Sequence, residues 1–277
     1  MFEVKIAFFV YLCYFWSINF DAMRMSFRTF AIVLSILCVV ACGEKKKLVS
    51  IQGGNVKIEA PAQVCDGMAA EVRAILEKGS AAVDSIRKPV IGTVAHALEK
   101  YPPESPLMNF AADALLVMAK KCTGQSVDVA ITNKGGLRSN LGKGDITFGD
   151  IYNVFPFENT LALLTLNGEQ LLQLCGEIAS VGGEAISGMR LVITKDGKLV
   201  EATVAGKSVD KSRSYRVATS DYLAQGNDKM TALALGTERE IMSGITLRDL
   251  MVQYIGFLTK DGKALSAECD GRITIRE

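Results

Sequence analysis

The feature that most constrains the fold is the interleaving of short β-branched runs with amphipathic stretches. Val90–Val94 and Val127–Thr132 are rich in β-branched residues and stand beside proline, glycine or polar residues, so each predicts a strand. Between them, Leu107–Lys121 places apolar residues at helical spacing, which predicts an amphipathic helix. Strands and helices alternate in this way without a repeated unit. The sequence therefore predicts an α/β (α+β) fold.

The same patterns predict the remaining elements of a single domain over residues 65–277. Helices are expected over Gly67–Arg87, Thr147–Val154, Gln170–Ile178 and Thr246–Thr259. Strands are expected over Leu161–Leu166, Met189–Thr194, Val200–Val204, Tyr215–Thr219 and Ile273–Arg276.

The N-terminal part of the chain has the pattern of an export signal. The apolar run 29–41 is shorter than the about 20 residues that a membrane-spanning helix needs. It ends in VVACG (39–43), which resembles a bacterial lipobox, in which Cys42 becomes the lipidated first residue. We predict a leader over 1–42, a tether over 43–64, and an exported lipoprotein anchored in a lipid bilayer through Cys42. An uncleaved membrane anchor is the alternative.

Residues 1–22 form a second apolar, aromatic stretch in front of this signal. A start at Met23 or Met25 would leave a short basic region before the apolar run, as an export signal requires. We therefore interpret residues 1–22 as lying upstream of the true start.

The charge balance argues against a surface for nucleic acid. The formal net charge is +1, and three of the basic and two of the acidic groups precede Cys42. The remainder carries 28 groups of each sign, so no overall field attracts a polyanion or an anionic membrane. A role in binding nucleotides would have to depend on a local site.

A glycine-bearing loop, Asn133–Arg138, follows one of the expected strands. Glycines let a backbone approach a ligand closely, and Arg138 can reach an anionic or hydroxyl-rich group. A P-loop is excluded, because Gly144 stands where serine or threonine would bind magnesium. By itself the loop is equally well explained as a tight turn.

A set of ordered segments resembles the C-terminal domain of the 5′-nucleotidase family. These segments are ESPLMNFAADA (104–114), NKGGLR (133–138), GDITFGDIY (144–152), FPFENT (155–160), LNG (166–168) and YRVATSDYLAQGND (215–228). The resemblance implies that family's layered sandwich of mixed sheets with flanking helices. It also implies a domain that binds the nucleoside part of a nucleotide. Lys134 and Glu158 depart from the family pattern, which has glycine at both positions.

The resemblance implies that three residues contact the base and the ribose of the ligand. Phe157 and Tyr222 occupy the positions of two aromatics that stack on either face of a base. Asp228 stands where a carboxylate accepts hydrogen bonds from ribose hydroxyls. As purely structural alternatives, both rings would belong to the core, and Asp228 would begin a turn or cap the segment 230–235.

Four further residues are implied as parts of the binding site. Arg138 is expected near the ribose and phosphate, and Asn133 and Asn159 are expected to reach the base or sugar edge. Gly188 matches a family turn that lines the pocket.

Hydrolysis in this family uses two metal ions held by histidines, aspartates and asparagines of a separate metallophosphoesterase domain. The chain has one histidine, His96, and its cysteines form no CxxC pair, so no metal or cofactor site is expected in it. We expect the specificity half of a split 5′-nucleotidase, inactive alone, whose separately encoded metallophosphoesterase partner holds the divalent metals. The alternatives are a nucleoside- or nucleotide-binding lipoprotein without catalysis and a structural remnant.

Overall fold

The computed structural model describes residues 66–276, which all lie in one compact unit, Gln63–Glu277. The leader 1–42, the Cys42 anchor and the tether 43–64 lie outside the described residues, so these boundaries stay predictions. Among residues 66–276, no helix is long and apolar enough to cross a bilayer.

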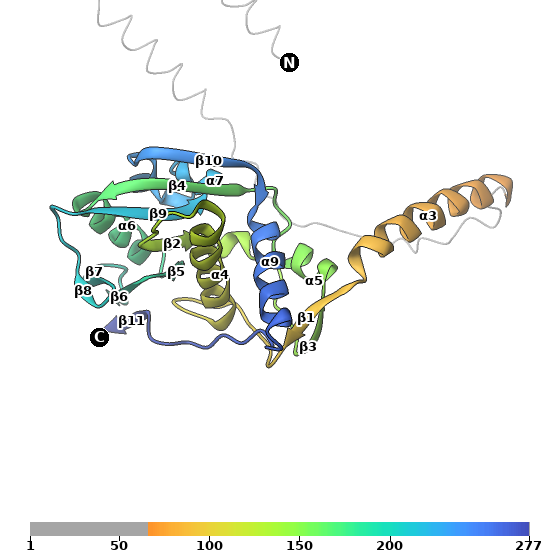
Figure 1. The fold of residues 1–277 in the computed structure, drawn as a ribbon, viewed down its shortest axis with the longest axis horizontal. Coiled ribbons are helices and arrows are strands. Elements are labelled where there is room, and N and C mark those ends of the chain that lie inside the picture. The colour runs from red at the N-terminus through yellow and green to blue at the C-terminus, as the bar shows by residue number, and fades with distance from the viewer. Residues whose placement is uncertain (1–65, 277) are drawn as a thin grey trace, which may run out of the picture. The chain divides into compact units, whose positions relative to one another are not determined.

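A five-stranded mixed sheet organises the fold (Figure 1). Its order is β10 (Thr237–Thr246), β4 (Thr160–Asn167), β9 (Ser214–Ser220), β2 (Val129–Thr132) and β5 (Ala185–Ser187). Only β2 and β9 pair in parallel, while the other neighbours are antiparallel.

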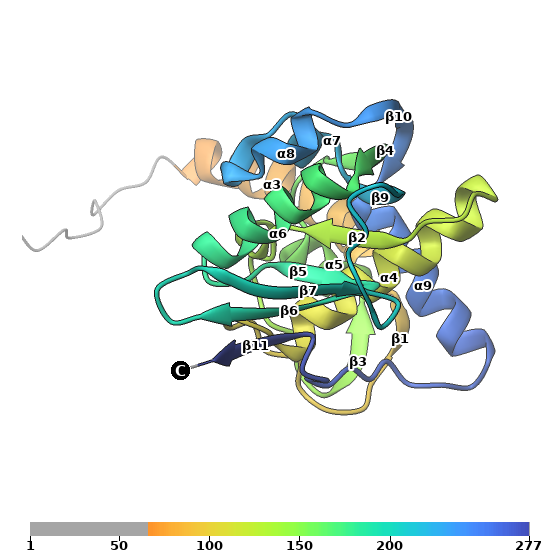
Figure 2. The ribbon, with the colours of Figure 1, turned by 90° about the vertical axis from the view of Figure 1, so that its left-hand side faces the viewer.

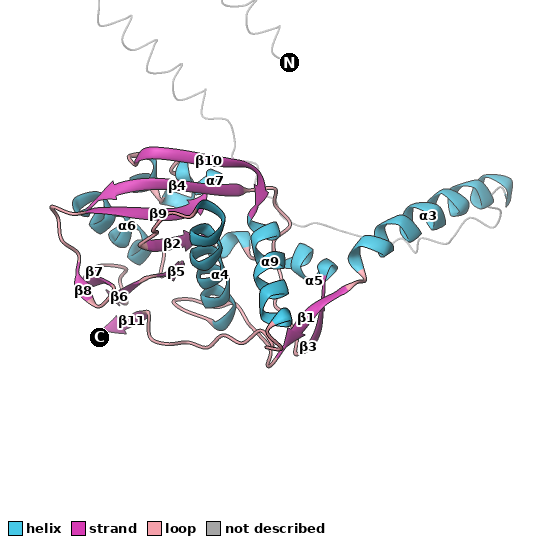
Figure 3. Ribbon diagram, viewed as in Figure 1, coloured by secondary structure: helices cyan, strands magenta, loops and turns pink. Residues whose placement is uncertain are grey.

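Side chains of this sheet alternate between two hydrophobic cores, as the two-residue period of a strand requires. In β4, Leu161 and Leu163 face the core that contains α4 (Pro106–Thr123) and α9 (Leu247–Lys260). Ala162 and Leu164 face the opposite core, which contains α6 (Gly168–Ser180). Helices therefore cover both faces of the sheet (Figure 1, Figure 3).

A second sheet completes the layers on the α6 side (Figure 2). Its order is β11 (Ile273–Arg276), β6 (Met189–Thr194), β7 (Leu199–Val204) and β8 (Lys207–Ser208). Leu191 and Val204 of this sheet share a core with Leu171 and Ile178 of α6. The predicted layered sandwich of mixed sheets with flanking helices is confirmed.

The remaining elements surround these layers. They are α3 (Asp66–Arg87), the antiparallel pair β1 (Val90–Val94) and β3 (Gly144–Thr147), α5 (Phe148–Val154), α7 (Asp221–Ala224) and α8 (Thr231–Ala234). Short 3-10 turns cover Lys134–Gly136 and Asn227–Lys229.

The predicted elements all occur, and most differ only at their ends. Thr147 and Thr246, expected as first helical residues, are instead N-caps whose side chains complete capping boxes with Asp150 and Asp249. Strand β10 was not predicted, because its sequence TEREIMSGIT is largely exposed at a sheet edge and lacks an apolar alternation.

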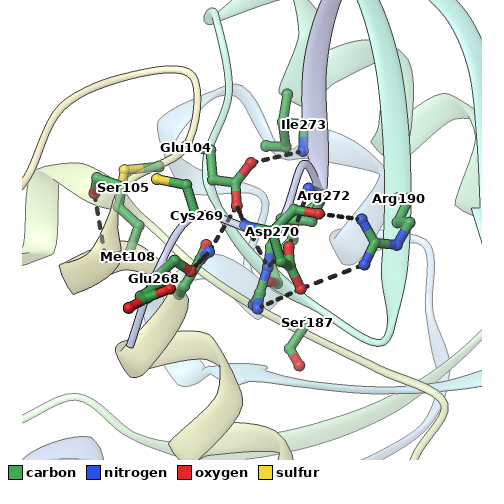
Figure 4. A network of polar contacts seen from close by, with 12 residues as sticks. Glu104, Ser105, Met108, Ser187, Arg190, Glu268, Cys269, Asp270, Arg272 and Ile273 are labelled. Atoms are coloured by element: carbon green, nitrogen blue, oxygen red, sulfur yellow. Dashed lines mark hydrogen bonds and ion pairs between the residues drawn. The ribbon is translucent and has the colours of Figure 1, made fainter. Parts of the chain in front are cut away.

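A polar cluster, which we call the C-terminal clasp, consists of the buried Glu104 and Arg272, the half-buried Asp113 and the exposed Asp270. Figure 4 shows Glu104, Asp270 and Arg272 of this cluster. Arg272 Nη1 donates to Asp113 Oδ1 at 2.8 Å, and its Nε donates to Asp270 Oδ1 at 3.0 Å. Glu104 Oε1 accepts from the Asp270 backbone N–H at 2.7 Å. The clasp thus joins the segment before α4 to the segment that leads into β11.

Within the clasp, the contact between Asp270 and Arg272 shifts the pKa values of both groups. Burial alone would raise the pKa of Asp270, but the hydrogen bond and charge of Arg272 outweigh it, so the pKa lies below its ordinary value. Burial would lower the pKa of Arg272, and its hydrogen bonds to Asp113 and Asp270 outweigh that effect and raise it. The ion pair of Asp270 with Arg272 therefore persists in moderate acid.

We predict that Arg272→Met destabilises the fold at neutral pH by about 2 kcal/mol, because clustered carboxylates lose their counter-charge. A carboxylate with a lowered folded pKa contributes stability above its unfolded pKa, about 3.9, and loses it as the pH falls through the folded value. The deficit of the variant should therefore shrink below about pH 4. Urea unfolding of both proteins across this pH range measures it.

Arg190→Met is the matched control, because Arg190 also pairs with Asp270 but its side chain is 53% exposed. It should cost less than about 1 kcal/mol. A deficit of Arg272→Met that stays constant from pH 7 to pH 3 would contradict this account of the clasp.

Candidate functional site

Three loops meet at one edge of the five-stranded sheet. The parallel pairing of β2 and β9 places their C-terminal ends together. The glycine loop (residues 133–138) follows β2, and the segment 221–228 follows β9. Because β4 runs antiparallel to β9, with Leu161 opposite Ser220, the aromatic loop (residues 155–159) enters β4 at the same edge.

Hydrogen bonds connect the three loops. Asn133 Nδ2 of the glycine loop donates to Asp228 Oδ2 at 2.6 Å. The Arg138 backbone N–H donates to the carbonyl oxygen of Val154, one residue before the aromatic loop, at 2.9 Å. Beyond that loop, the Thr160 backbone N–H donates to Asp221 Oδ1 at 3.0 Å. The loops therefore form one connected surface.

Asp228 lies at the centre of these contacts. Its backbone has φ of 53°, a left-handed conformation that a residue other than glycine seldom adopts without a local reason. One carboxylate oxygen accepts from Asn133, and the other accepts from the Tyr222 hydroxyl at 2.9 Å. A carboxylate has about four acceptor sites, so each oxygen keeps capacity for a hydroxyl of a ligand.

Phe157 and Tyr222 carry exposed aromatic rings on two of the three loops, and Tyr222 contacts this carboxylate. Phe157 is 48% exposed and Tyr222 is 38% exposed, so neither ring belongs to a hydrophobic core. Tyr222 is held by its hydroxyl bond to Asp228, while Phe157 lies in the neighbouring aromatic loop. Exposed rings on adjoining loops offer flat apolar surface to a planar ligand.

Arg138 and Asn159 lie on the loops that form this surface. Arg138 is exposed, and its Nη1 donates to the carbonyl oxygen of Gly135 in the same loop at 3.3 Å. Asn159 is half-buried, and its carbonyl oxygen accepts from the Leu247 backbone N–H at 2.9 Å. Six of the seven predicted binding residues are thus brought to one sheet edge: Asn133, Arg138, Phe157, Asn159, Tyr222 and Asp228.

Gly188 is not brought to this edge. In the antiparallel pairing of β2 with β5, Ala130 is opposite Ser187, so Gly188 lies at the N-terminal end of β2, whereas Asn133 follows its C-terminal end. Gly188 has φ of 81°, and a Cβ there would lie 2.2 Å from the Asp128 carbonyl oxygen. Only glycine fits at this corner between the two sheets. Gly188 also lines a cavity of about 360 Å³ there.

The structure adds Glu184 to the residues around the site. The carboxylate of Glu184 accepts from the Lys134 backbone N–H at 2.5 Å, and Lys134 Nζ lies 3.2 Å from its other oxygen. Burial raises the pKa of Glu184, bonds and charge from Lys134 partly oppose this, and the Asp228 carboxylate adds to the rise. Sequence analysis missed this contact because the two residues are 50 positions apart.

The amine of Lys134 is bound by groups of the protein itself. Its Nζ donates to the carbonyl oxygens of Val181 at 2.9 Å and Gly183 at 2.7 Å, besides the ion pair with Glu184. The amine therefore fixes the glycine loop to the turn before β5. Arg138 is the cation of this loop whose side chain is exposed.

The described residues contain no group of three or more histidine, cysteine, aspartate or glutamate side chains that could hold a metal ion. His96 is half-buried, and its Nε2 lies 3.0 Å from the carbonyl oxygen of Ala267. The surface built by the three loops offers aromatic faces, a carboxylate and a guanidinium. Such a set can bind a planar, hydroxyl-bearing, anionic ligand.

A model of the family "5′-nucleotidase, C-terminal domain" matches residues 90–235, more than half of the chain. The chain therefore belongs to this family. A crystal structure of a 5′-nucleotidase precursor from Thermus thermophilus superposes with a TM-score of 0.62 and 26% identity. That comparison covers 76% of this chain and 43% of the other.

Two curated relatives extend the comparison. The trifunctional nucleotide phosphoesterase protein YfkN of Bacillus subtilis is 32% identical over 185 residues, which are 61% of this chain and 12% of that protein. The cell wall protein Lmo0130 of Listeria monocytogenes is 29% identical over 186 residues, which are 61% of this chain and 23% of that protein. The chain thus matches less than a quarter of the length of each.

We predict that Asp228→Ala lowers the pKa of Tyr222 toward its ordinary value of about 10. In the wild-type protein this pKa is raised, chiefly by the hydrogen bond that the hydroxyl donates to Asp228. The bond is therefore present below the raised pKa and is lost above it. Ultraviolet difference titration, with Tyr222→Phe subtracted to isolate this phenol, measures the change.

Asn133→Ala is the control for this titration, because it removes the other partner of Asp228 and leaves the bond to Tyr222 in place. The pKa of Tyr222 should stay raised in that variant. Identical titration of Tyr222 in the wild-type protein and in Asp228→Ala would show that the contact does not form in solution.

Proposed function

We propose that this chain binds the nucleoside part of a nucleotide at the edge where the three loops meet. The observation that carries the proposal is the Asp228 carboxylate, held by Asn133 and Tyr222, at the edge where Phe157 and Tyr222 expose their rings on adjoining loops. A base between the rings would gain stacking on its faces. The Asp228 carboxylate would accept hydrogen bonds from the ribose hydroxyls.

The phosphate end of the ligand would lie toward Arg138. This guanidinium is exposed on the glycine loop and is oriented by the Gly135 carbonyl. A guanidinium matches two phosphate oxygens better than an ammonium does. Asn133 and Asn159 would supply polar contacts to the base or sugar.

Hydrolysis would be performed by a metallophosphoesterase unit outside these 277 residues, which we propose is a separate chain that holds the divalent metals. The support is chemical: phosphoryl transfer by two metals needs several nitrogen and oxygen ligands, and the chain has one histidine. YfkN, a nucleotide phosphoesterase by name, contains a matching region within a much longer protein.

We further propose that the chain is exported and anchored in a membrane through a lipidated Cys42. Residues 29–43 resemble an export signal that ends in a lipobox, and the relative Lmo0130 is a cell wall protein by name. Such a location would place the binding surface where extracytoplasmic nucleotides are degraded.

We predict that the purified chain binds at least one of AMP, GMP, CMP and UMP, and that Phe157→Ala weakens this binding about tenfold through lost stacking. Asp228→Ala should weaken it by a similar factor through lost ribose contacts. Isothermal titration calorimetry measures both. Ile275→Ala, which removes a 47% exposed apolar side chain from β11, should leave the affinity unchanged.

Absence of binding to all four nucleotides would overturn the proposal and favour a structural remnant. Loss of affinity in Ile275→Ala as large as in Phe157→Ala would show that the rings have no special role.

We predict that the chain alone releases no phosphate from the bound nucleotide. A mixture with a metallophosphoesterase chain from the same source should release it in the presence of a divalent metal, and Phe157→Ala should slow this release. Phosphate colorimetry at substrate concentrations below saturation measures the effect. Equal release by the metallophosphoesterase with and without this chain would count against a split enzyme.

A further inference from the structure

Arg248 is a buried cation that is not among the predicted binding residues and lies outside the two hydrophobic cores. It is 7% exposed and lies in the first turn of α9. A cation in this position faces the positive end of the helix dipole, which is unfavourable. Its Nε has no hydrogen-bond partner among the described residues. Its position at the helix start and its unpaired Nε are both unfavourable, so other contacts of Arg248 must offset them.

The contacts of Arg248 lie on both sides of Phe157. Its Nη1 donates to the carbonyl oxygen of Phe155 at 3.1 Å, and its Nη2 donates to Glu158 Oε1 at 2.5 Å. The guanidinium carbon also lies 4.6 Å from the ring centroid of Tyr152 in α5, within the range of a cation–π contact. One planar group therefore connects α9, α5 and the aromatic loop.

The backbone of α9 adds a further connection to the same loop. The Leu247 N–H, at the first residue of the helix, donates to the carbonyl oxygen of Asn159 at 2.9 Å. Residues before and after Phe157 are thus tied to the start of one helix. The Phe157 side chain itself remains 48% exposed. The arrangement fixes the backbone of the loop and leaves its ring available to a ligand.

Glu158 completes this arrangement from the exposed side. Its side chain is 70% exposed, whereas that of its partner Arg248 is 9% exposed. The ion pair needs a carboxylate at this position, and a glycine there could not form it. Because a glycine would leave the loop more conformational freedom, glutamate and its bond to Arg248 restrict the aromatic loop of this chain.

We propose that Arg248 is a positioning residue that holds the aromatic loop in the conformation that presents Phe157 to the base of the ligand. The inference rests on the proposed function, in which Phe157 stacks on that base. Arg248 does not touch the ligand. Its effect on binding passes through Phe157, so it should disappear when the ring is absent.

A double-mutant cycle tests this dependence, with calorimetry of the full chain against the best-bound of AMP, GMP, CMP and UMP. Arg248→Met should raise the dissociation constant about fivefold, somewhat less than Phe157→Ala, which removes the ring outright. In the Phe157→Ala background, Arg248→Met should cause less than about a twofold further loss. In the Asp228→Asn background it should cause the full fivefold loss, since Asp228 acts on another part of the ligand.

A merely structural role for Arg248 would give the same loss in both backgrounds, and that result would overturn the proposal. Arg248→Lys keeps the charge but loses the planar fork whose two nitrogens donate separately to Phe155 and Glu158, so its affinity should lie between those of the wild-type protein and Arg248→Met. Circular dichroism at the titration temperature establishes that each variant is folded.

If Arg248→Met does not fold, Glu158→Gln tests the same contact from its other partner. Glu158 is exposed, so its replacement leaves the core intact. It should raise the dissociation constant about twofold to threefold, and only when Phe157 is present. Wild-type protein that binds no nucleotide would defeat the proposed function. Binding that responds to Phe157→Ala but to neither Arg248→Met nor Glu158→Gln would defeat this inference alone.

Discussion

The parallel pairing of β2 with β9 is the constraint on which the site depends. Parallel neighbours end at the same sheet edge, so the glycine loop after β2 and the segment with Tyr222 and Asp228 after β9 meet there. The antiparallel strand β4 begins at this edge and adds the aromatic loop. Residues nearly a hundred positions apart, such as Asn133 and Asp228, can therefore form a hydrogen bond. Moving any of these strands to another place in the sheet would separate the loops.

Charged pairs fix two of the loops that form the site. Lys134 is bound by Glu184, and Glu158 is bound by Arg248. Lys134 and Glu158 each have a counter-charge on another segment of the chain, and these contacts fix their loops. Because an ion pair with a buried partner contributes little net stability, its main consequence here is a defined loop conformation, which is what a binding surface needs.

Membership of the 5′-nucleotidase C-terminal domain family and the geometry of the loops point to the same kind of ligand. The family match covers residues 90–235, and this range contains the glycine loop, the aromatic loop and Asp228. The site has aromatic faces and hydrogen-bonding groups but lacks, among the described residues, a cluster that could hold a metal. Under the proposed function, binding and catalysis are separable, because recognition of base and ribose would need no metal, whereas phosphoryl transfer by a two-metal mechanism does.

The sequence by itself determined the helices other than the four-residue α7 and α8, and most of the strands, because apolar periodicity is a local property. Its ordered motifs also named six residues that the structure brings to one edge. It did not determine β10, whose charged residues lie at an exposed sheet edge. It grouped Gly188 with the binding residues, although strand pairing places it at the other end of β2. Tertiary structure alone decided the contacts of Arg248 with Glu158 and of Lys134 with Glu184. These pairs are 90 and 50 positions apart, and only the order of strands brings them together.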